Sequence, residues 1–263
     1  MHLKPKKSLG QNFLVDKNIQ GKIIAACELK PDDTVLEIGA GRGELTRLLV
    51  SRAALVYALE IDRGLCAILR DNLKGCGNLK IINRDILKFS LSRYFSRCEK
   101  KIKVIGNIPY YITTPILARL FAFRDKIDAA FLTVQKEFAV RAAASPGSKD
   151  CGALSCFVRY YSEPKIIFSI KKGSFSPAPK VDSSLLCLKM RARVEKEGRE
   201  EKNLFRIIRA AFGKRRKTLR NSLKGVVGQE RLDAFFKKFY IDCDIRPERL
   251  RLKDFINLLE TKA

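Results

Sequence analysis

The stretch that decides the fold is residues 34–43, which read TVLEIGAGRG. A mostly apolar, strand-forming segment runs directly into a turn that contains Gly39, Gly41 and Gly43. Glycine lets the backbone turn sharply and approach a ligand closely. A second apolar segment, residues 54–60, ends in Glu60, whose carboxylate can accept hydrogen bonds from both hydroxyls of a ribose. The stretch therefore predicts a strand, a nucleoside-binding turn and a helix.

Strand-like and helix-like segments alternate on both sides of this stretch. Helices are expected over residues 17–29, 44–52, 63–74, 114–123 and 135–144. Apolar strands are expected over residues 34–38, 54–60, 79–83, 102–105, 127–134, 165–170 and 184–189. This alternation indicates an α/β fold with a mostly parallel, seven-stranded, Rossmann-like sheet covered on both faces.

The pattern changes after the charged stretch 191–202, which is typical of a linker. Only helices are expected beyond it, over residues 203–211, 215–224, 229–239 and 247–259, with Pro247 in the first turn of the last one. We therefore expect two domains, one over residues 1–194 and a small all-helical one over residues 195–263.

The composition indicates a polyanionic partner. The 263 residues are 46% hydrophobic, enough for a buried core, and carry a formal net charge of +25. A folded chain this basic attracts nucleic acid. The alternative is a basic protein whose charge serves only solubility.

The cysteine and histidine content argues against metal or triad chemistry. The eight Cys include no close C-x-x-C pair and the only His is His2, so we predict no metal site and free thiols in a reducing compartment. The first residues lack the apolar core of a signal peptide, and no segment is long and apolar enough to span a membrane. We expect a cytoplasmic protein without a membrane partner.

The glycine turn favours a cofactor without a pyrophosphate. A dinucleotide fingerprint places glycine at the position that Glu44 occupies here. An acid at a helix N-terminus would repel a pyrophosphate, which favours a methyltransferase over a NAD enzyme. Asp85, just after the third strand, is a candidate acceptor for an adenine amino group; a turn or helix-cap Asp is the alternative.

The fourth strand ends in the most specific motif of the chain, GNIPYY over residues 106–111. The Asn107 side-chain oxygen and the Ile108 carbonyl can accept both N–H groups of an exocyclic amine and aim its lone pair at a methyl donor. Pro109 fixes the backbone, and Tyr110 offers a stacking face for an unstacked base. Catalysis would rest on positioning and electrostatics. The alternative is an ordinary strand-end turn.

These motifs resemble known enzymes. The acid-x-Gly-x-Gly-x-Gly turn resembles motif I of class I S-adenosylmethionine methyltransferases. The form Gly-Asn-Ile-Pro-Tyr resembles the rRNA adenine dimethyltransferases, whereas DNA adenine enzymes usually carry Pro at the second place after Asn. Three further stretches resemble family signatures of the small-subunit (KsgA) type: residues 7–14, 175–183 and 212–221.

The resemblance implies a class I methyltransferase fold and S-adenosyl-L-methionine as cofactor. It implies that residues 1–194 form the catalytic domain that binds the cofactor and that residues 195–263 form an RNA-binding domain. It implies cofactor contacts from Asn12, Leu14, Gly39, Gly41, Gly43, Glu60, Asp85 and Asn107. It implies a reaction site of Asn107, Ile108, Pro109 and Tyr110, with Phe175 holding the target base. It implies that phosphates bind Lys214, Arg215, Arg216, Lys217 and Arg220; a solvated helix face is the alternative for that cluster.

The resemblance further implies a reaction and its substrate. The reaction is N6-dimethylation of two adjacent adenines in a hairpin loop near the 3′ end of small-subunit (16S) rRNA, within the immature small subunit. The enzyme would be a monomer that takes part in ribosome biogenesis. Three alternatives stay open. They are the related large-subunit enzyme that confers macrolide resistance, a non-catalytic RNA-binding assembly factor, and a DNA adenine methyltransferase.

Overall fold

The computed structural model describes residues 5–6, 9–96, 98–214 and 216–262. The chain divides into two compact units. Unit 1 consists of Met1–Ala139 and Glu163–Ala192, and unit 2 of Val140–Ser162 and Arg193–Ala263. The predicted division at residues 194 and 195 does not assign residues 140–162 to the C-terminal part, and the role of each domain stays a prediction.

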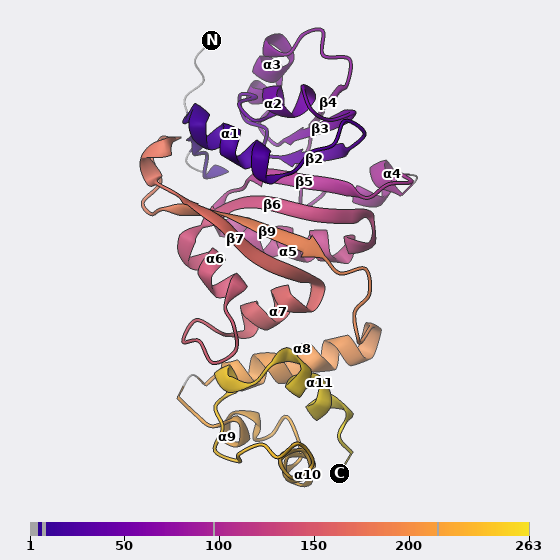
Figure 1. Ribbon diagram of the computed structural model, residues 1–263, viewed down its shortest axis with the longest axis vertical. Coiled ribbons are helices and arrows are strands. Elements are labelled where there is room, and N and C mark those ends of the chain that lie inside the picture. The colour runs from indigo at the N-terminus through magenta and orange to yellow at the C-terminus, as the bar shows by residue number, and fades with distance from the viewer. Residues whose placement is uncertain (1–4, 7–8, 97, 215, 263) are drawn as a thin grey trace. The chain divides into compact units, whose positions relative to one another are not determined.

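A seven-stranded sheet of order β4-β3-β2-β5-β6-β9-β7 forms the centre of unit 1 (Figure 1). The pairs β2–β3, β3–β4, β2–β5 and β5–β6 are parallel, and β9 pairs with β6 antiparallel. The strands are β2 (Thr34–Ile38), β3 (Leu55–Glu60), β4 (Leu79–Asn83), β5 (Ile102–Asn107), β6 (Ile127–Gln135), β7 (Ser162–Ile170) and β9 (Ser183–Met190). The predicted mostly parallel, seven-stranded α/β sheet is confirmed.

Helices cover the sheet of unit 1. Helices α1 (Lys17–Ala26) and α2 (Thr46–Val50) bury Ile23, Ile24 and Leu49 in one apolar cluster with residues of the strands. Helix α4 (Leu91–Phe95) packs Phe95 edge-on against Tyr57 of β3, with ring centroids 4.9 Å apart. Helices α3 (Arg63–Asn72), α5 (Thr113–Ala122) and the first part of α6 (Lys136–Ala143) complete the covering.

A short two-stranded sheet fixes the N-terminal segment of unit 1. Strand β1 (Phe13–Leu14) pairs antiparallel with β8 (Phe175–Ser176). This pairing places residues 9–14 beside the carboxyl ends of the parallel strands, where ligands of open α/β sheets bind.

Unit 2 contains helices and no strand of its own among the residues that the structure describes, apart from the first residue of β7. The helices are α7 (Ala153–Tyr161), α8 (Gly198–Phe212), α9 (Leu219–Leu223), α10 (Gln229–Phe239) and α11 (Leu252–Glu260). Tyr161 of α7 stacks on Phe205 of α8 at 5.9 Å between centroids. The predicted all-helical C-terminal part is confirmed.

Three sequence-based expectations about elements are wrong. Residues 198–202 belong to α8 rather than to a linker, because Glu200 and Glu201 stabilise the first turn of a helix whose buried residues begin at Leu204. Pro247 does not lie in the first turn of the last helix. It begins a separate 3-10 helix, Pro247–Arg249, and the extended backbone of Leu250 separates this helix from α11. Helix α7 was not among the expected helices.

No helix in the described part of the chain combines the length and the apolar character needed to cross a membrane.

Candidate active site at the carboxyl ends of the strands

One pocket of unit 1 gathers residues from the carboxyl ends of the parallel strands and from the N-terminal segment. The predicted cofactor residues that line it are Asn12, Gly39, Gly41, Glu60, Asp85 and Asn107, and the predicted reaction residues that line it are Asn107, Ile108, Pro109 and Tyr110. Because β2, β3, β4 and β5 are parallel, their carboxyl ends meet at one edge of the sheet. The topology thus brings together residues that are far apart in the sequence.

The glycine turn after β2 needs its glycines at two lining positions. Gly39 and Gly41 have φ angles of 76° and 60°, a region that side chains other than glycine rarely adopt. A Cβ at Gly39 would lie 3.2 Å from the backbone oxygen of Asn107. The turn and the tip of β5 are therefore in close approach, so a ligand on one is next to a ligand on the other.

Glu60 sits at the end of β3 as a buried carboxylate with backbone partners. Its Oε2 accepts from the Gly41 amide at 2.9 Å, and its Oε1 accepts from the Asp62 amide at 2.9 Å. Burial raises the pKa of the Glu60 carboxyl. Each carboxylate oxygen has a second lone pair, so Glu60 can hold the turn and still accept from a bound hydroxyl.

Asp85 lines the pocket after β4 and is half-buried. Its Oδ1 accepts from the Leu87 amide at 2.9 Å, which makes it the cap of the following turn. The position of Asp85 therefore agrees with both expectations, an acceptor for an adenine amino group and the cap of a turn.

Glu37, the acid of the motif, lies behind the turn and does not line the pocket. It is 2% exposed, and the Thr46 hydroxyl donates to its Oε2 at 2.6 Å. Burial, with smaller contributions from the nearby Glu44 and Glu60, raises the pKa of the Glu37 carboxyl to about 8, although the Thr46 hydrogen bond opposes this rise. Its role is to fix the turn against α2.

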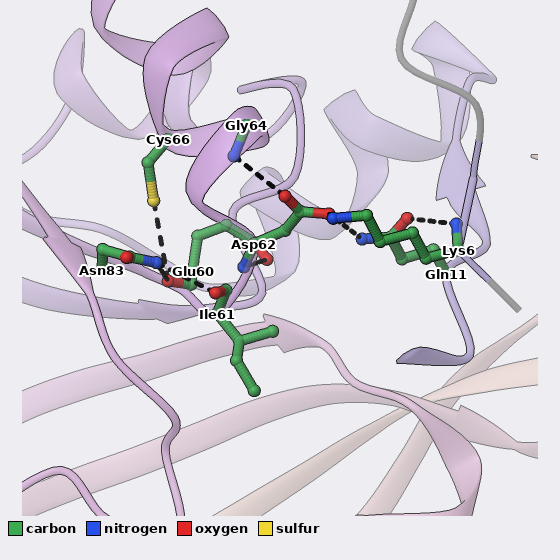
Figure 2. A network of polar contacts seen from close by, with 8 residues as sticks. All are labelled: Lys6, Gln11, Glu60, Ile61, Asp62, Gly64, Cys66 and Asn83. Atoms are coloured by element: carbon green, nitrogen blue, oxygen red, sulfur yellow. Dashed lines mark hydrogen bonds and ion pairs between the residues drawn. The ribbon is translucent and has the colours of Figure 1, made fainter. Parts of the chain in front are cut away.

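A polar network ties the N-terminal segment to β3 and α3 (Figure 2). Asp62 caps α3 at the Gly64 amide, pairs with Lys6 Nζ at 2.9 Å and accepts from Gln11 Nε2 at 3.3 Å. Burial opposes the ionised form, but these hydrogen bonds together lower the pKa of the Asp62 carboxyl. Gln11 and Asp62 were not among the predicted site residues. The signal that could have found Asp62 was an acidic residue two positions after Glu60, directly before an expected helix.

At the reaction end, a hydrogen bond orients the side chain of Asn107. Its Nδ2 donates to the Asn12 carbonyl at 2.7 Å. Because this bond uses Nδ2, the other polar atom of the Asn107 side chain, Oδ1, is left to accept from a ligand. No hydrogen bond in the described part of the chain uses Oδ1 or the Ile108 carbonyl. Asn107 and Ile108 both line the pocket, so two consecutive residues each offer an acceptor that is not used by the described residues.

The two tyrosines of the motif have different surroundings. Tyr110 is half-buried and shares a 2.6 Å hydrogen bond with the Ser183 hydroxyl, and burial raises the pKa of its phenol. Tyr111 is 64% exposed and also lines the pocket. Tyr111 was not among the predicted site residues.

Three predicted site residues lie away from the pocket wall. A Cβ at Gly43 would lie 2.7 Å from Leu69 Cδ1, so Gly43 serves the packing of α3. Leu14 and Phe175 are register partners in the small sheet and are buried in the apolar cluster, 3% and 4% exposed. Their predicted ligand contacts stay predictions.

The predicted phosphate-binding residues belong to unit 2. Lys214, Arg216 and Lys217 are exposed, and Arg215 lies outside the described residues. Arg220 differs, because it pairs with Asp233 at 2.6 Å and lies over the Phe236 ring at 5.2 Å. A phosphate would have to compete with Asp233 for Arg220.

The sheet order, the glycine turn facing an acid at the end of β3, and the acceptor pair at the tip of β5 define a class I methyltransferase. Comparison with known proteins names the family. The chain matches the family described as "Ribosomal RNA adenine dimethylase" over residues 2–263. It belongs to the ribosomal RNA adenine dimethylase family.

Relatives are similar over nearly their whole length. "Ribosomal RNA small subunit methyltransferase A" from Pelotomaculum thermopropionicum is 43% identical and covers 98% of this chain and 92% of its own. The protein of the same name from Moorella thermoacetica is also 43% identical, covering 98% and 93%. Among solved structures, a dimethyladenosine transferase from Plasmodium falciparum has a TM-score of 0.82 at 27% identity, covering 94% and 95%. The 23S rRNA methyltransferase ErmE has a TM-score of 0.75 at 28% identity, covering 95% and 98%.

Proposed function

We propose that this protein uses S-adenosyl-L-methionine to dimethylate N6 of two adjacent adenines in a hairpin loop near the 3′ end of small-subunit (16S) rRNA. It acts as a cytoplasmic monomer on the immature small ribosomal subunit, as a step of subunit biogenesis. The single observation that carries the proposal is the unpartnered Asn107 Oδ1 beside the Ile108 carbonyl, in the same pocket as the turn of Gly39, Gly41 and Glu60.

The pocket fits a nucleoside cofactor without phosphates. Glu60 is placed to accept from ribose hydroxyls, and the Asp85 carboxylate to accept from an adenine amine. The carboxyls of Glu44 and Glu60 accept from the Arg42 and Gly41 amides of the glycine turn, and acidic groups there disfavour a pyrophosphate and favour a cationic ligand. When bound, this cofactor supplies an electrophilic methyl group on a sulfonium.

The residues at the tip of β5 supply orientation rather than a base. The lone pair of an adenine amine is delocalised into the ring, so the amine is a poor nucleophile. Accepting both N–H groups on Asn107 Oδ1 and the Ile108 carbonyl pulls the nitrogen toward tetrahedral geometry and directs its lone pair. The proton becomes acidic as the new N–C bond forms and leaves to solvent.

The same acceptors suffice for a second transfer. A monomethylated amine has one N–H left, and one of the two acceptors can hold it while the lone pair again points away from both. The Pro109 backbone, with φ of −61°, lacks an N–H that would compete for these oxygens.

The names of the relatives support the small subunit. The two bacterial relatives at 43% identity are small-subunit enzymes, whereas the 23S enzyme is 28% identical. Exposed Lys214, Arg216 and Lys217 provide a phosphate-binding surface, as a substrate of RNA requires.

The test is methyl transfer from labelled cofactor to purified ribosomal subunits that lack the modification, followed by digestion to nucleosides. We expect N6,N6-dimethyladenosine in small-subunit rRNA, with a primer-extension stop at two neighbouring adenines. Label in large-subunit rRNA or in duplex DNA would show that this nucleic acid, and not small-subunit rRNA, is the substrate. Unlabelled subunits that still bind the protein would make it an assembly factor without catalysis.

A further inference from the structure

We propose that Tyr111 is a nucleobase-binding residue, whose ring stacks on a base next to the target adenine in single-stranded RNA. The inference rests on the proposed function and names a residue for the neighbouring nucleotide. It assigns different tasks to the two tyrosines of the motif. Tyr110 faces the target base, and Tyr111 faces its neighbour.

The first observation is the contrast between the two rings. Tyr110 is tied through its hydroxyl to Ser183 and is half-buried. Tyr111 is 64% exposed, and its hydroxyl has no hydrogen bond to another of the described residues. A large exposed aromatic side chain at the lining of a reaction pocket is available to a ligand, and both rings border the same pocket.

The second observation is that one edge of the Tyr111 ring lies near Gly10 of the N-terminal segment. A Cβ built at Gly10 would lie 3.1 Å from Tyr111 Cε1 and 3.5 Å from Cδ1, and Gly10 has a φ of 61°. A side chain at residue 10 would therefore crowd this edge of the ring, and glycine leaves the ring accessible to a ligand.

The third observation is a cation on the same lining. Arg84 is exposed and borders the pocket after β4. Tyr111 follows β5 and Arg84 follows β4, so the two residues border the same pocket from strands that two others separate. An aromatic ring that takes a base and a cation that takes a backbone phosphate farther along the strand are the groups that bind unpaired nucleic acid.

The chemistry of the reaction needs such a contact. An amine can reach Asn107 only if its base leaves the stack, which also removes a stacking partner from the adjacent base. An aromatic ring at the pocket mouth replaces that partner. Base–aromatic stacking tolerates any base, so Tyr111 would support either of two adjacent adenines as the target while the other is the neighbour.

A purely structural role of Tyr111 predicts different measurements. If the ring only packs on Gly10, its loss would loosen the N-terminal segment, which lines the cofactor pocket, and cofactor affinity would fall. Tyr111→Phe keeps the ring, and Tyr111→Leu keeps an apolar contact with Gly10 but has no aromatic face.

The experiment measures binding of a hairpin RNA with two adjacent loop adenines to the full chain, with S-adenosylhomocysteine present to prevent turnover. Tyr111→Ala and Tyr111→Leu should weaken RNA binding by roughly tenfold to a hundredfold, while Tyr111→Phe binds as the wild type does. Cofactor affinity should be the same in all four proteins.

The decisive arm uses hairpins with an abasic residue on the 5′ or the 3′ side of the target adenine. The wild type should bind one of these abasic RNAs with the weak affinity that Tyr111→Ala shows for the intact RNA. Tyr111→Ala should bind that abasic RNA and the intact RNA with the same affinity. Equal losses in both proteins on both RNAs would overturn the inference, as would loss of cofactor affinity in Tyr111→Leu. The subunit-methylation assay reports separately on the proposed function, because RNA binding by the Tyr111 variants is measured without turnover and does not depend on whether the wild type forms dimethyladenosine.

Discussion

The two ends of the pocket are built in opposite ways. At the cofactor end, Glu60 and Asp62 are satisfied by backbone amides, Lys6 and Gln11, so the carboxylates are fixed before any ligand binds. At the reaction end, Asn107 has one anchored atom and one unpartnered oxygen.

This difference separates binding from catalysis. The tip of β5 offers an acceptor, Asn107 Oδ1, that a substrate amine can use without displacing a protein partner. We therefore expect the cofactor end to contribute mainly to affinity and the reaction end mainly to the rate of transfer.

The largest expected effect is at the reaction end, although the variant also loses the hydrogen bond from Asn107 Nδ2 to the Asn12 carbonyl. Asn107→Ala removes the acceptor Oδ1 and should lower the transfer rate by about 10²–10³-fold, as loss of one positioned polar group does in other enzymes. Cofactor binding should persist. Single-turnover transfer measures the rate and calorimetry the affinity; equal loss of both would make Asn107 a structural residue.

The next effect breaks the cofactor end alone. Glu60→Gln replaces one carboxylate oxygen with an NH2 group, which can accept neither from a ribose hydroxyl nor from the backbone amide that this oxygen serves. Cofactor binding should weaken by roughly tenfold to a hundredfold. RNA affinity serves as the control and should not change. Because burial raises the pKa of Glu60, wild-type cofactor affinity should fall on acidification at a higher pH than an ordinary glutamate would cause. The variant should lack this pH dependence.

A smaller effect concerns Glu37, the buried acid behind the glycine turn. The folded protein keeps a proton on Glu37 up to about pH 8, whereas an ordinary glutamate releases it near 4.5. The folded state thus binds more protons in this window, and stability falls as the pH rises through it. Glu37→Gln, which can still accept from Thr46, should be more stable than the wild type by ~1–3 kcal/mol above this window. Denaturant unfolding across the pH range checks this; a difference that does not grow with pH would contradict it.

The smallest effect lies outside both ends. Replacing Lys214, Arg216 and Lys217 with Ala should lower the salt slope of RNA binding by about 0.7–0.9 for each phosphate that these side chains neutralise in the wild type. Arg220→Ala is the matched control, since Asp233 already pairs with that arginine, and should change the slope less. An equal change for Arg220 would show that the phosphate displaces Asp233.

The sequence was sufficient for the sheet and for the centre of the pocket. Apolar strands alternating with helices fix a parallel order, and parallel strands place Gly39, Glu60, Asp85 and Asn107 at one edge whatever the details of the loops. The family resemblance supplied Asn12, which no local pattern would have selected.

The remainder depends on three-dimensional contacts. Gly43 looks like its two neighbours in the turn, yet only the packing of Leu69 shows that it faces α3. The burial of Phe175 follows from the β1–β8 pairing, which joins residues distant in sequence, and no local pattern indicated that Tyr111 is exposed. The start of α8 was hidden because its first turn is charged and its apolar stripe begins later.

The central claim is that Asn107 Oδ1 holds the adenine amine. The most direct measurement compares a hairpin RNA carrying adenine at the target position with one carrying purine, which lacks the amine, on the wild type and on Asn107→Ala. We predict that the wild type binds the adenine RNA more tightly and that the variant does not distinguish the two. The same preference in both proteins would contradict the claim.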